Sequence, residues 1–196
     1  YWRSIRRDPM RELSLNVMDI VQNSISAGAD LITLSVRESR REDSLVISIR
    51  DNGRGMTEEQ VRRVTDPFYT TRTTRKVGLG VPLFKMEAEM TGGDFSIDST
   101  PGKGTDVTAR FVPSHVDMIP LGDINATVKL LISCNPQIDF VFIRTTDSGE
   151  FTLDTRELRQ VLGEDVPLSD PEVVEWIDGF LREQTDALGE TKAAAE

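Results

Sequence analysis

IRDNGRGMTEEQ, residues 49–60, ends an alternating apolar run with a carboxylate and follows it with two glycines spaced one residue apart. Leu45, Ile47 and Ile49 recur with the period of two that is typical of a β-strand, and Asp51 continues the same parity. We therefore expect Asp51 to point toward the core side of a strand. Because an unpaired buried charge is very costly, this side chain needs a partner. The alternative interpretation is an Asn-Gly turn beside an incidental acid.

Composition limits the classes of function. The chain has 196 residues, enough to bury a substantial core, and no run approaches the roughly 18 apolar residues of a membrane span. Its start, YWRSIRR, lacks the apolar region of a secretory signal, and Cys134 is the one cysteine. With a formal net charge of -10, a general nucleic-acid binder is not expected, because phosphate backbones are bound by clustered Lys and Arg. We predict a soluble, cytoplasmic protein that binds neither nucleic acid nor membrane.

Hydrophobic periodicity in the first 112 residues predicts an α+β fold. We expect helices over residues 9–27, 58–64 and 81–90, and two hairpins that pair residues 31–38 with 45–51 and residues 94–98 with 106–111. Asp8 and Pro9 would start the first helix, and Gly28 would end it.

The first predicted helix carries two stripes of side chains. The apolar stripe, which should face a core, contains Leu13, Val17, Ile20, Val21 and Ile25. The polar stripe follows spacings of three and four and contains Asn16, Asp19, Asn23 and Ser26. The polar groups should therefore line one edge of this helix.

Residues 70–80 are rich in cations and glycine. They include Arg72, Arg75 and Lys76 but no acid, and two glycines then lead into the helix expected at residues 81–90. Free backbone N–H groups and the positive end of the dipole at such a helix start bind phosphate groups. We therefore predict that an anion binds here.

Residues 113–196 predict a small α+β extension. The pattern indicates helices over residues 121–133, 155–163 and 169–184, with a hairpin centred on residues 147–149. Ser169 or Asp170 would cap the last helix. Phe140, Phe142 and Phe151 in the hairpin are expected to be core residues, although an exposed edge could also dock a partner.

Together these features resemble the ATP-binding domain of the GHKL superfamily, which includes gyrase, heat-shock chaperone, sensor histidine kinase and mismatch-repair ATPases. The resemblance covers residues 10–112 and rests on four motifs in order, which are DIVQNSISAGAD (19–30), DNGRGM (51–56), KVGLGVPL (76–83) and PGKGT (101–105). It implies a Bergerat fold, a two-layer α/β sandwich with a mixed sheet and helices on one face, over residues 1–112, followed by the extension at 113–196. The chain is also similar to stand-alone members of the family found beside bacterial iron-hydrogenase genes, which implies a hydrogenase-related partner.

The resemblance implies that the ligands are ATP and Mg²⁺. Asp51 would accept a hydrogen bond from the adenine amine, and the other residues at the base would be Gly53, Gly55, Met56 and Thr105. Asn23 would ligate Mg²⁺ through its side-chain oxygen. The phosphates would be held by Arg72, Arg75, Lys76, Gly78, Leu79 and Gly80. The alternatives are a helix-surface asparagine for Asn23 and solvated charges for the three cations.

Asp19 matches the position at which ATPases of the family have a glutamate that orients or deprotonates water. It is one methylene shorter, and a misplacement of about 1 Å can cost on the order of a hundredfold in rate. Weak hydrolysis or a different phosphate acceptor is therefore expected, and a carboxylate that contacts only its helix neighbours is the alternative. Phe68 resembles the phenylalanine at the start of the histidine-kinase lid and equally fits a core position.

His115 is the only histidine, and SHVDMIPL around it is similar to the phosphoacceptor box of sensor kinases. The acid comes two residues later rather than one, and the box follows the ATP-binding motifs instead of preceding them. A neutral linker histidine fits this pattern better. Two functions remain open: an ATPase or phosphotransferase acting on water, a protein side chain or His115, and a regulatory module whose nucleotide changes the surface shown to a partner.

Overall fold

The structure, a computed structural model, describes residues 12–66, 80–163 and 165–189. These residues build one mixed six-stranded sheet, with strand order β3-β4-β2-β1-β5-β6. Its strands are β1 (Leu31–Ser39), β2 (Ser44–Asp51), β3 (Asp94–Thr100), β4 (Gly104–Phe111), β5 (Asp139–Thr146) and β6 (Gly149–Asp154). β1 and β5 run parallel, and the other neighbouring pairs are antiparallel.

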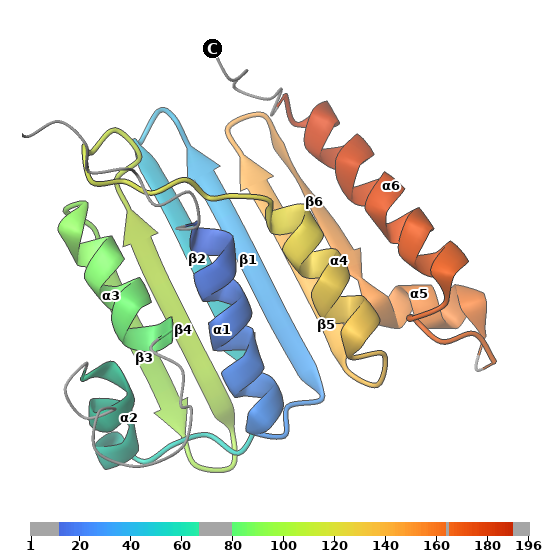
Figure 1. The fold of residues 1–196 in the computed structure, drawn as a ribbon, viewed down its shortest axis with the longest axis horizontal. Helices are drawn as coiled ribbons and strands as arrows, with labels where there is room; N and C mark the ends of the chain where they lie inside the picture. Colours follow the sequence, from blue (N-terminus) through green and yellow to red (C-terminus); the bar gives the residue numbers. More distant parts are fainter. Residues whose placement is uncertain (1–11, 67–79, 164, 190–196) are drawn as a thin grey trace, which may run out of the picture.

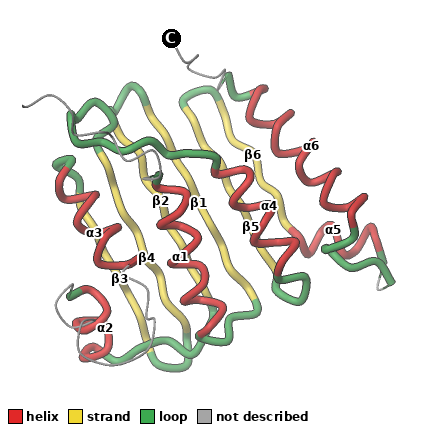
Figure 2. Tube along the Cα trace, viewed as in Figure 1, coloured by secondary structure: helices red, strands yellow, loops and turns green. Residues whose placement is uncertain are grey.

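Helices complete the two layers. They are α1 (Leu13–Ser26), α2 (Glu58–Thr65), α3 (Gly80–Met90), α4 (Ile124–Cys134), α5 (Thr155–Leu162) and α6 (Pro171–Ala187). α1, α3 and α4 lie side by side across one face of the sheet, and α6 packs beside α4 (Figures 1 and 2). This arrangement confirms the expected α+β fold with a mixed sheet. Within the described ranges, no helix is both long and apolar enough to cross a membrane.

The register of the sheet follows the predicted alternation. In the β1–β2 hairpin Leu34 lies opposite Ile49, and all the even-numbered apolar residues of β1 from 32 to 36 are buried. On its other side β2 pairs with β4, and there Asp51 lies opposite Thr105. Because both residues lie on the helix-covered face, the sheet brings a carboxylate and a hydroxyl together under α1. The two hairpins expected before residue 112 are confirmed.

The start of α1 differs from the expectation. The helix begins at Leu13, four residues later than predicted, because Glu12 has an extended backbone with φ -132° and ψ 144°. Asp8 and Pro9 lie outside the described residues. The amides of Leu13 and Ser14 donate to the carbonyls of Pro120 and Leu121, at 3.0 and 2.9 Å. The loop before α4 therefore satisfies amides that a side-chain cap would otherwise have to serve.

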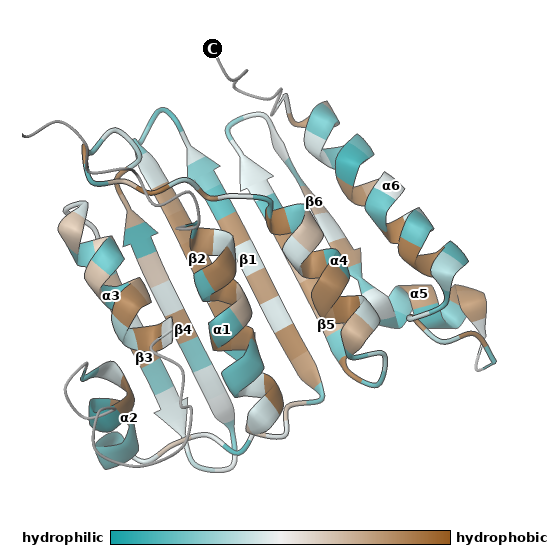
Figure 3. Cartoon of the chain, in the orientation of Figure 1, coloured by the Kyte–Doolittle hydropathy of each residue, from teal (hydrophilic) through white to brown (hydrophobic). Residues whose placement is uncertain are grey.

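Among the described residues, one hydrophobic core joins the helices to the sheet. Figure 3 shows hydrophobic and hydrophilic residues alternating along the strands, and Leu13, Val17 and Val21 of α1 are fully buried against them. Phe140 and Phe142 of β5 belong to the same core, as predicted. The boundary at residue 112 stays a prediction, but the residues after it extend the same sheet by two strands.

Candidate functional site

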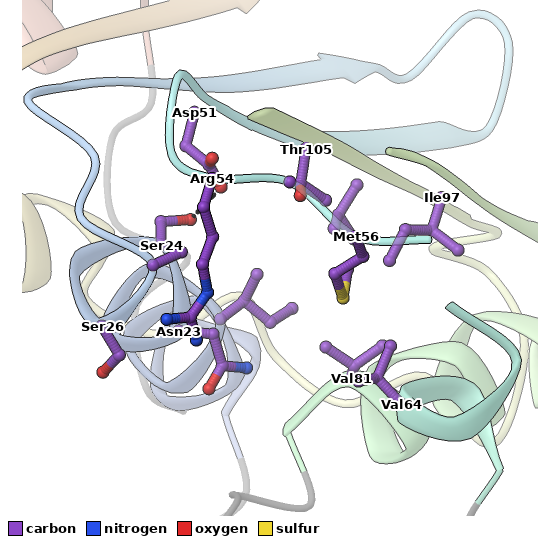
Figure 4. Close-up of a pocket in the computed structure, with 14 residues that line it drawn as sticks. Asn23, Ser24, Ser26, Asp51, Arg54, Met56, Val64, Val81, Ile97 and Thr105 are labelled. Atoms are coloured by element: carbon purple, nitrogen blue, oxygen red, sulfur yellow. Dashed lines mark hydrogen bonds between the residues drawn. The ribbon is translucent and has the colours of Figure 1, made fainter. Parts of the chain in front are cut away.

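A cavity of about 280 Å³ opens between the C-terminal half of α1 and the sheet. Its wall is formed by residues from α1, from β2 and the loop after it, and from α2, α3, β3 and β4 (Figure 4). The lining residues are Ile20, Asn23, Ser24, Ser26, Ala27, Asp51, Arg54, Gly55, Met56, Val64, Val81, Ile97, Thr105 and Val107. Aliphatic side chains form most of the wall, and a few polar groups converge at one side, as is typical of small-molecule sites.

Asp51 is the acid of this cavity, and it points inward as its parity predicts. Its side chain is buried, with 9% of the residue exposed. The Ser24 hydroxyl donates to Oδ2 at 2.6 Å, and the amide of Gly53 donates to Oδ1 at 2.9 Å. A carboxylate has about four acceptor positions, so it keeps capacity for a donor that enters the cavity.

The two glycines after Asp51 permit close approaches of the backbone. Gly55 has φ +65°, and a Cβ there would lie 2.0 Å from the carbonyl oxygen of Thr100. At Gly53, a Cβ would lie 3.0 Å from Asp51 Oδ1 and 3.0 Å from the Cβ of Ala27. Only glycine fits at position 55, because both the left-handed backbone and the neighbouring carbonyl exclude a side chain. The backbone of this loop therefore packs directly against the β3–β4 turn.

Thr105 and Met56 form the side of the cavity near β3. The hydroxyls of Thr105 and Ser99 are 2.8 Å apart, and the Met56 amide donates to the Ser99 hydroxyl at 2.8 Å. Ser99 therefore links the loop after β2 to β4. Thr105 and Met56 both line the cavity as the sequence predicts, whereas Ser99 was not predicted from the sequence.

The polar stripe of α1 runs along the edge of the cavity. Asn23 is half-buried and lines the cavity, whereas Asp19, about one turn earlier, is exposed and lies outside the lining. Asp19 instead meets the start of α3, where a Cβ added at Gly80 would lie 2.7 Å from the Asp19 Cβ. The structure thus brings Asp51, Gly55, Met56, Asn23 and Thr105 to one cavity and places Asp19 beside it.

Part of the predicted site falls on residues that the structure does not describe. Arg72, Arg75, Lys76, Gly78 and Leu79, as well as Phe68, lie outside the described residues. Their assignment to phosphate binding therefore stays a prediction. His115 is described: it lies in the loop between β4 and α4, where its Nδ1 accepts from the amide of Asp117 at 3.2 Å, and it does not line the cavity.

Two functional candidates were not predicted from the sequence. Ser24 donates the shorter of the two hydrogen bonds to Asp51. The sequence pattern that could have identified it is its position four residues after Ile20, which puts both residues on the buried side of α1. Arg54 lies between the two glycines in a loop, where neither helical nor strand periodicity predicts the direction of a side chain. Figure 4 shows its side chain reaching from the loop toward α1, with the guanidinium on the side of Asn23 and Ser26.

These residues fit a purine nucleotide with a bound hard cation. The cavity volume is close to the lower end of small-molecule sites, about 300 Å³, which suits a base and a ribose with the phosphates extending beyond. The part of the chain described here has no cluster of three or more His, Cys, Asp or Glu that could hold a metal ion. The amide oxygen of Asn23 suits Mg²⁺, which takes most of its ligands from water and phosphate.

Comparison with known proteins identifies the same region. A family model described as "Histidine kinase-, DNA gyrase B-, and HSP90-like ATPase" matches residues 10–115. Similar relatives include the sensor histidine kinase RcsC of Escherichia coli, 34% identical over 113 residues, and the cell-division control histidine kinase PdhS of Brucella anthropi, 29% identical over 120 residues. Each alignment covers 55% of this chain but only 12% of RcsC and 11% of PdhS. The chain therefore spans about a tenth of these relatives.

Among solved structures, the chain is similar to the ATPase domain of Aquifex aeolicus MutL complexed with ADP. The two share 13% sequence identity with a TM-score of 0.45, and the alignment covers 94% of this chain and 99% of that chain. The N-terminal domain of a DNA repair protein aligns over 78% of this chain and 57% of that chain, with 16% identity and a TM-score of 0.49.

Proposed function

Because the chain belongs to the family of histidine kinase-, DNA gyrase B- and HSP90-like ATPases, we propose that it binds Mg-ATP and transfers the γ-phosphate to water or to a partner protein. The observation that carries this proposal is the buried carboxylate of Asp51 at the wall of the cavity between α1 and the sheet. A buried acid with free acceptor capacity needs a donor, and the exocyclic amine of adenine supplies one.

The chemistry of the lining sets the orientation of the nucleotide. The base lies against Asp51 and Thr105, near the loop that contains Gly55, and the aliphatic wall covers its faces. The phosphates then leave toward Asn23. We assign the cations at residues 72–76 to the β and γ phosphates, since charge-assisted hydrogen bonds from guanidinium and ammonium groups are strong.

The polar edge of α1 carries the proposed chemistry. Asn23 contributes a side-chain oxygen to Mg²⁺, and the ion, when bound, neutralises charge on the phosphates during transfer. Asp19 orients or deprotonates the attacking group as the catalytic residue. Its exposure and its closeness to Gly80 at the start of α3 support this role.

A regulatory module with little turnover is the second candidate function. The observation that favours it is Asp19 itself, because a short, exposed carboxylate outside the cavity lining is a weak choice for positioning water. In this case nucleotide binding would change the surface that the protein presents and so alter its affinity for a partner.

Incubation with γ-labelled ATP and magnesium tests both functions. Free phosphate and acid-labile or acid-stable protein label are followed in the wild type, in Asp19→Asn and in Asp98→Asn, a control at an exposed carboxylate outside the cavity. Loss of phosphate release in Asp19→Asn alone supports an ATPase. Acid-labile label lost in His115→Ala supports transfer to that histidine, and tight binding without any product supports the regulatory module. Absence of nucleotide binding contradicts both.

The biological setting is part of the proposal. We propose a bacterial cytoplasmic setting, because the similar histidine kinases come from bacteria and the single cysteine, Cys134, suits a reducing compartment. Its phosphate acceptor or regulatory partner is proposed to be another protein, and a hydrogenase-related protein is one candidate. Pull-down from a native host extract in the presence and absence of ATP identifies this partner.

A further inference from the structure

Arg54 is the one cation that lines the cavity within the described residues, and Asp51 is the one acid. The two charges serve different ends of the cavity. Figure 4 shows the Arg54 side chain running from the loop toward α1, with its guanidinium on the side of Asn23. Asp51, in contrast, lies at the end of β2, where its carboxylate accepts hydrogen bonds from Ser24 and Gly53. The cavity therefore has an acceptor end and a cationic end.

The backbone of Arg54 is fixed on both sides. Its amide donates to the carbonyl of Ala27 at 3.0 Å, and its carbonyl accepts from the amide of Gly102 at 2.7 Å. Gly55, the next residue, has a left-handed backbone pressed against Thr100. These contacts join the loop to the end of α1 and to the β3–β4 turn. The side chain therefore starts from a rigid position and needs little reorganisation to bind a ligand.

Arg54 forms no ion pair with another described residue, although the full chain carries a net charge of -10. Arg54 is exposed, so its guanidinium is accessible to water and to a ligand. A cation placed in a pocket wall without a protein partner suits an anionic group of the ligand. A guanidinium binds a phosphate through two parallel hydrogen bonds, which a neutral ribose cannot match.

We propose that Arg54 binds the phosphate nearest the ribose. The cavity would thereby bind nucleotides more tightly than nucleosides. This inference rests on the proposed function, because a purine held by Asp51 directs its phosphates toward Asn23 and the Arg54 guanidinium. The contact is independent of the cations at residues 72–76. It acts equally on AMP, ADP and ATP and does not require the γ-phosphate.

Calorimetric titration of adenosine, AMP and ADP in magnesium buffer tests the proposal. For Arg54→Ala we expect the Kd of AMP and ADP to rise about tenfold or more, while the Kd of adenosine changes by less than about twofold. Arg54→Lys keeps the charge but loses the paired hydrogen bonds, so its affinities should fall between the two. Arg50→Ala is the matched control, because it removes the same charge. Arg50 is exposed and directly precedes Asp51 in β2, so its side chain points to the opposite face of the sheet.

Three results would overturn the inference. Arg54→Ala could bind ADP as tightly as the wild type, it could lose adenosine and ADP equally, or Arg50→Ala could weaken ADP as much as Arg54→Ala does. In each case nucleotide binding by the wild type still supports the proposed function. If the wild type bound none of the three ligands, the proposed function would fail together with the inference. Thermal unfolding of each variant shows that any loss of affinity belongs to a folded protein.

Discussion

Asp51→Asn replaces one oxygen atom of the cavity wall with an amide nitrogen, and we expect a large loss of affinity for ADP. The amide of Gly53 needs an oxygen acceptor, so the new side chain keeps its oxygen there and turns its nitrogen toward Ser24. The Ser24 hydroxyl, now 2.6 Å from Oδ2, can rotate from donating to accepting. We therefore expect the free energy of unfolding to change by no more than about 1 kcal/mol.

The same substitution removes the negative charge that would hold the adenine amine. Hydrogen bonds to charged groups contribute about 1.5–3 kcal/mol, which corresponds to a loss of about 10- to 150-fold in affinity. Base discrimination should fall as well, because a carboxylate repels the carbonyl oxygen that guanine presents where adenine has its amine.

Calorimetry with ADP and GDP measures both effects, and Ser24→Ala is the control because it removes a neighbour and keeps the carboxylate. The reasoning is wrong if Asp51→Asn binds ADP with the affinity of the wild type. It is also wrong if the wild type binds GDP as tightly as ADP.

Three further substitutions test two glycine positions and one ion pair. Gly55→Ala should destabilise the fold by about 1–3 kcal/mol more than Gly92→Ala and abolish ADP binding. Both glycines have positive φ, but of the two only Gly55 has a carbonyl oxygen 2.0 Å from the position of an added Cβ. Urea unfolding measures the loss of stability, and ADP titration measures the loss of binding. Gly179→Ala should stabilise the protein by about 0.5–1 kcal/mol, since this residue lies inside α6 with open space around its Cβ, and a lower urea midpoint would contradict that. Lys129 donates to Asp178 at 2.7 Å and so lowers the pKa of that carboxyl below 3.8. The contribution of this pair is present at neutral pH and is lost as the pH falls, so Lys129→Met should cost up to about 1 kcal/mol at pH 7 and progressively less below about pH 4.

The local patterns of the sequence predicted the elements that depend on neighbouring residues. Period two placed Asp51 inward because a sheet gives alternate residues to opposite faces, and this parity holds regardless of what covers the sheet. The usual burial of aromatic residues in an apolar hairpin predicted Phe140 and Phe142 as core residues, and both are buried. Asp170 caps α6 as one of the two predicted candidates, with its side chain accepting from the amide of Glu172.

Features that depend on distant residues were not predicted. The start of α1 is set by carbonyls of Pro120 and Leu121, more than a hundred residues later, so no capping pattern near Leu13 could reveal it. The parallel pairing of β5 with β1 is equally non-local. Arg54 was missed because a single residue between glycines has no period, and only the cavity shows where its side chain leads.

The parallel alignment of β5 with β1 has a practical consequence for anyone who shortens this chain. A fragment that ends near residue 112 would contain every ATP-binding motif but leave one side of β1 without a hydrogen-bonding neighbour. That side belongs to a strand with Ile32, Leu34 and Val36, and such open edges recruit strands from other molecules. The last two strands thus shield the nucleotide-binding half of the sheet from aggregation.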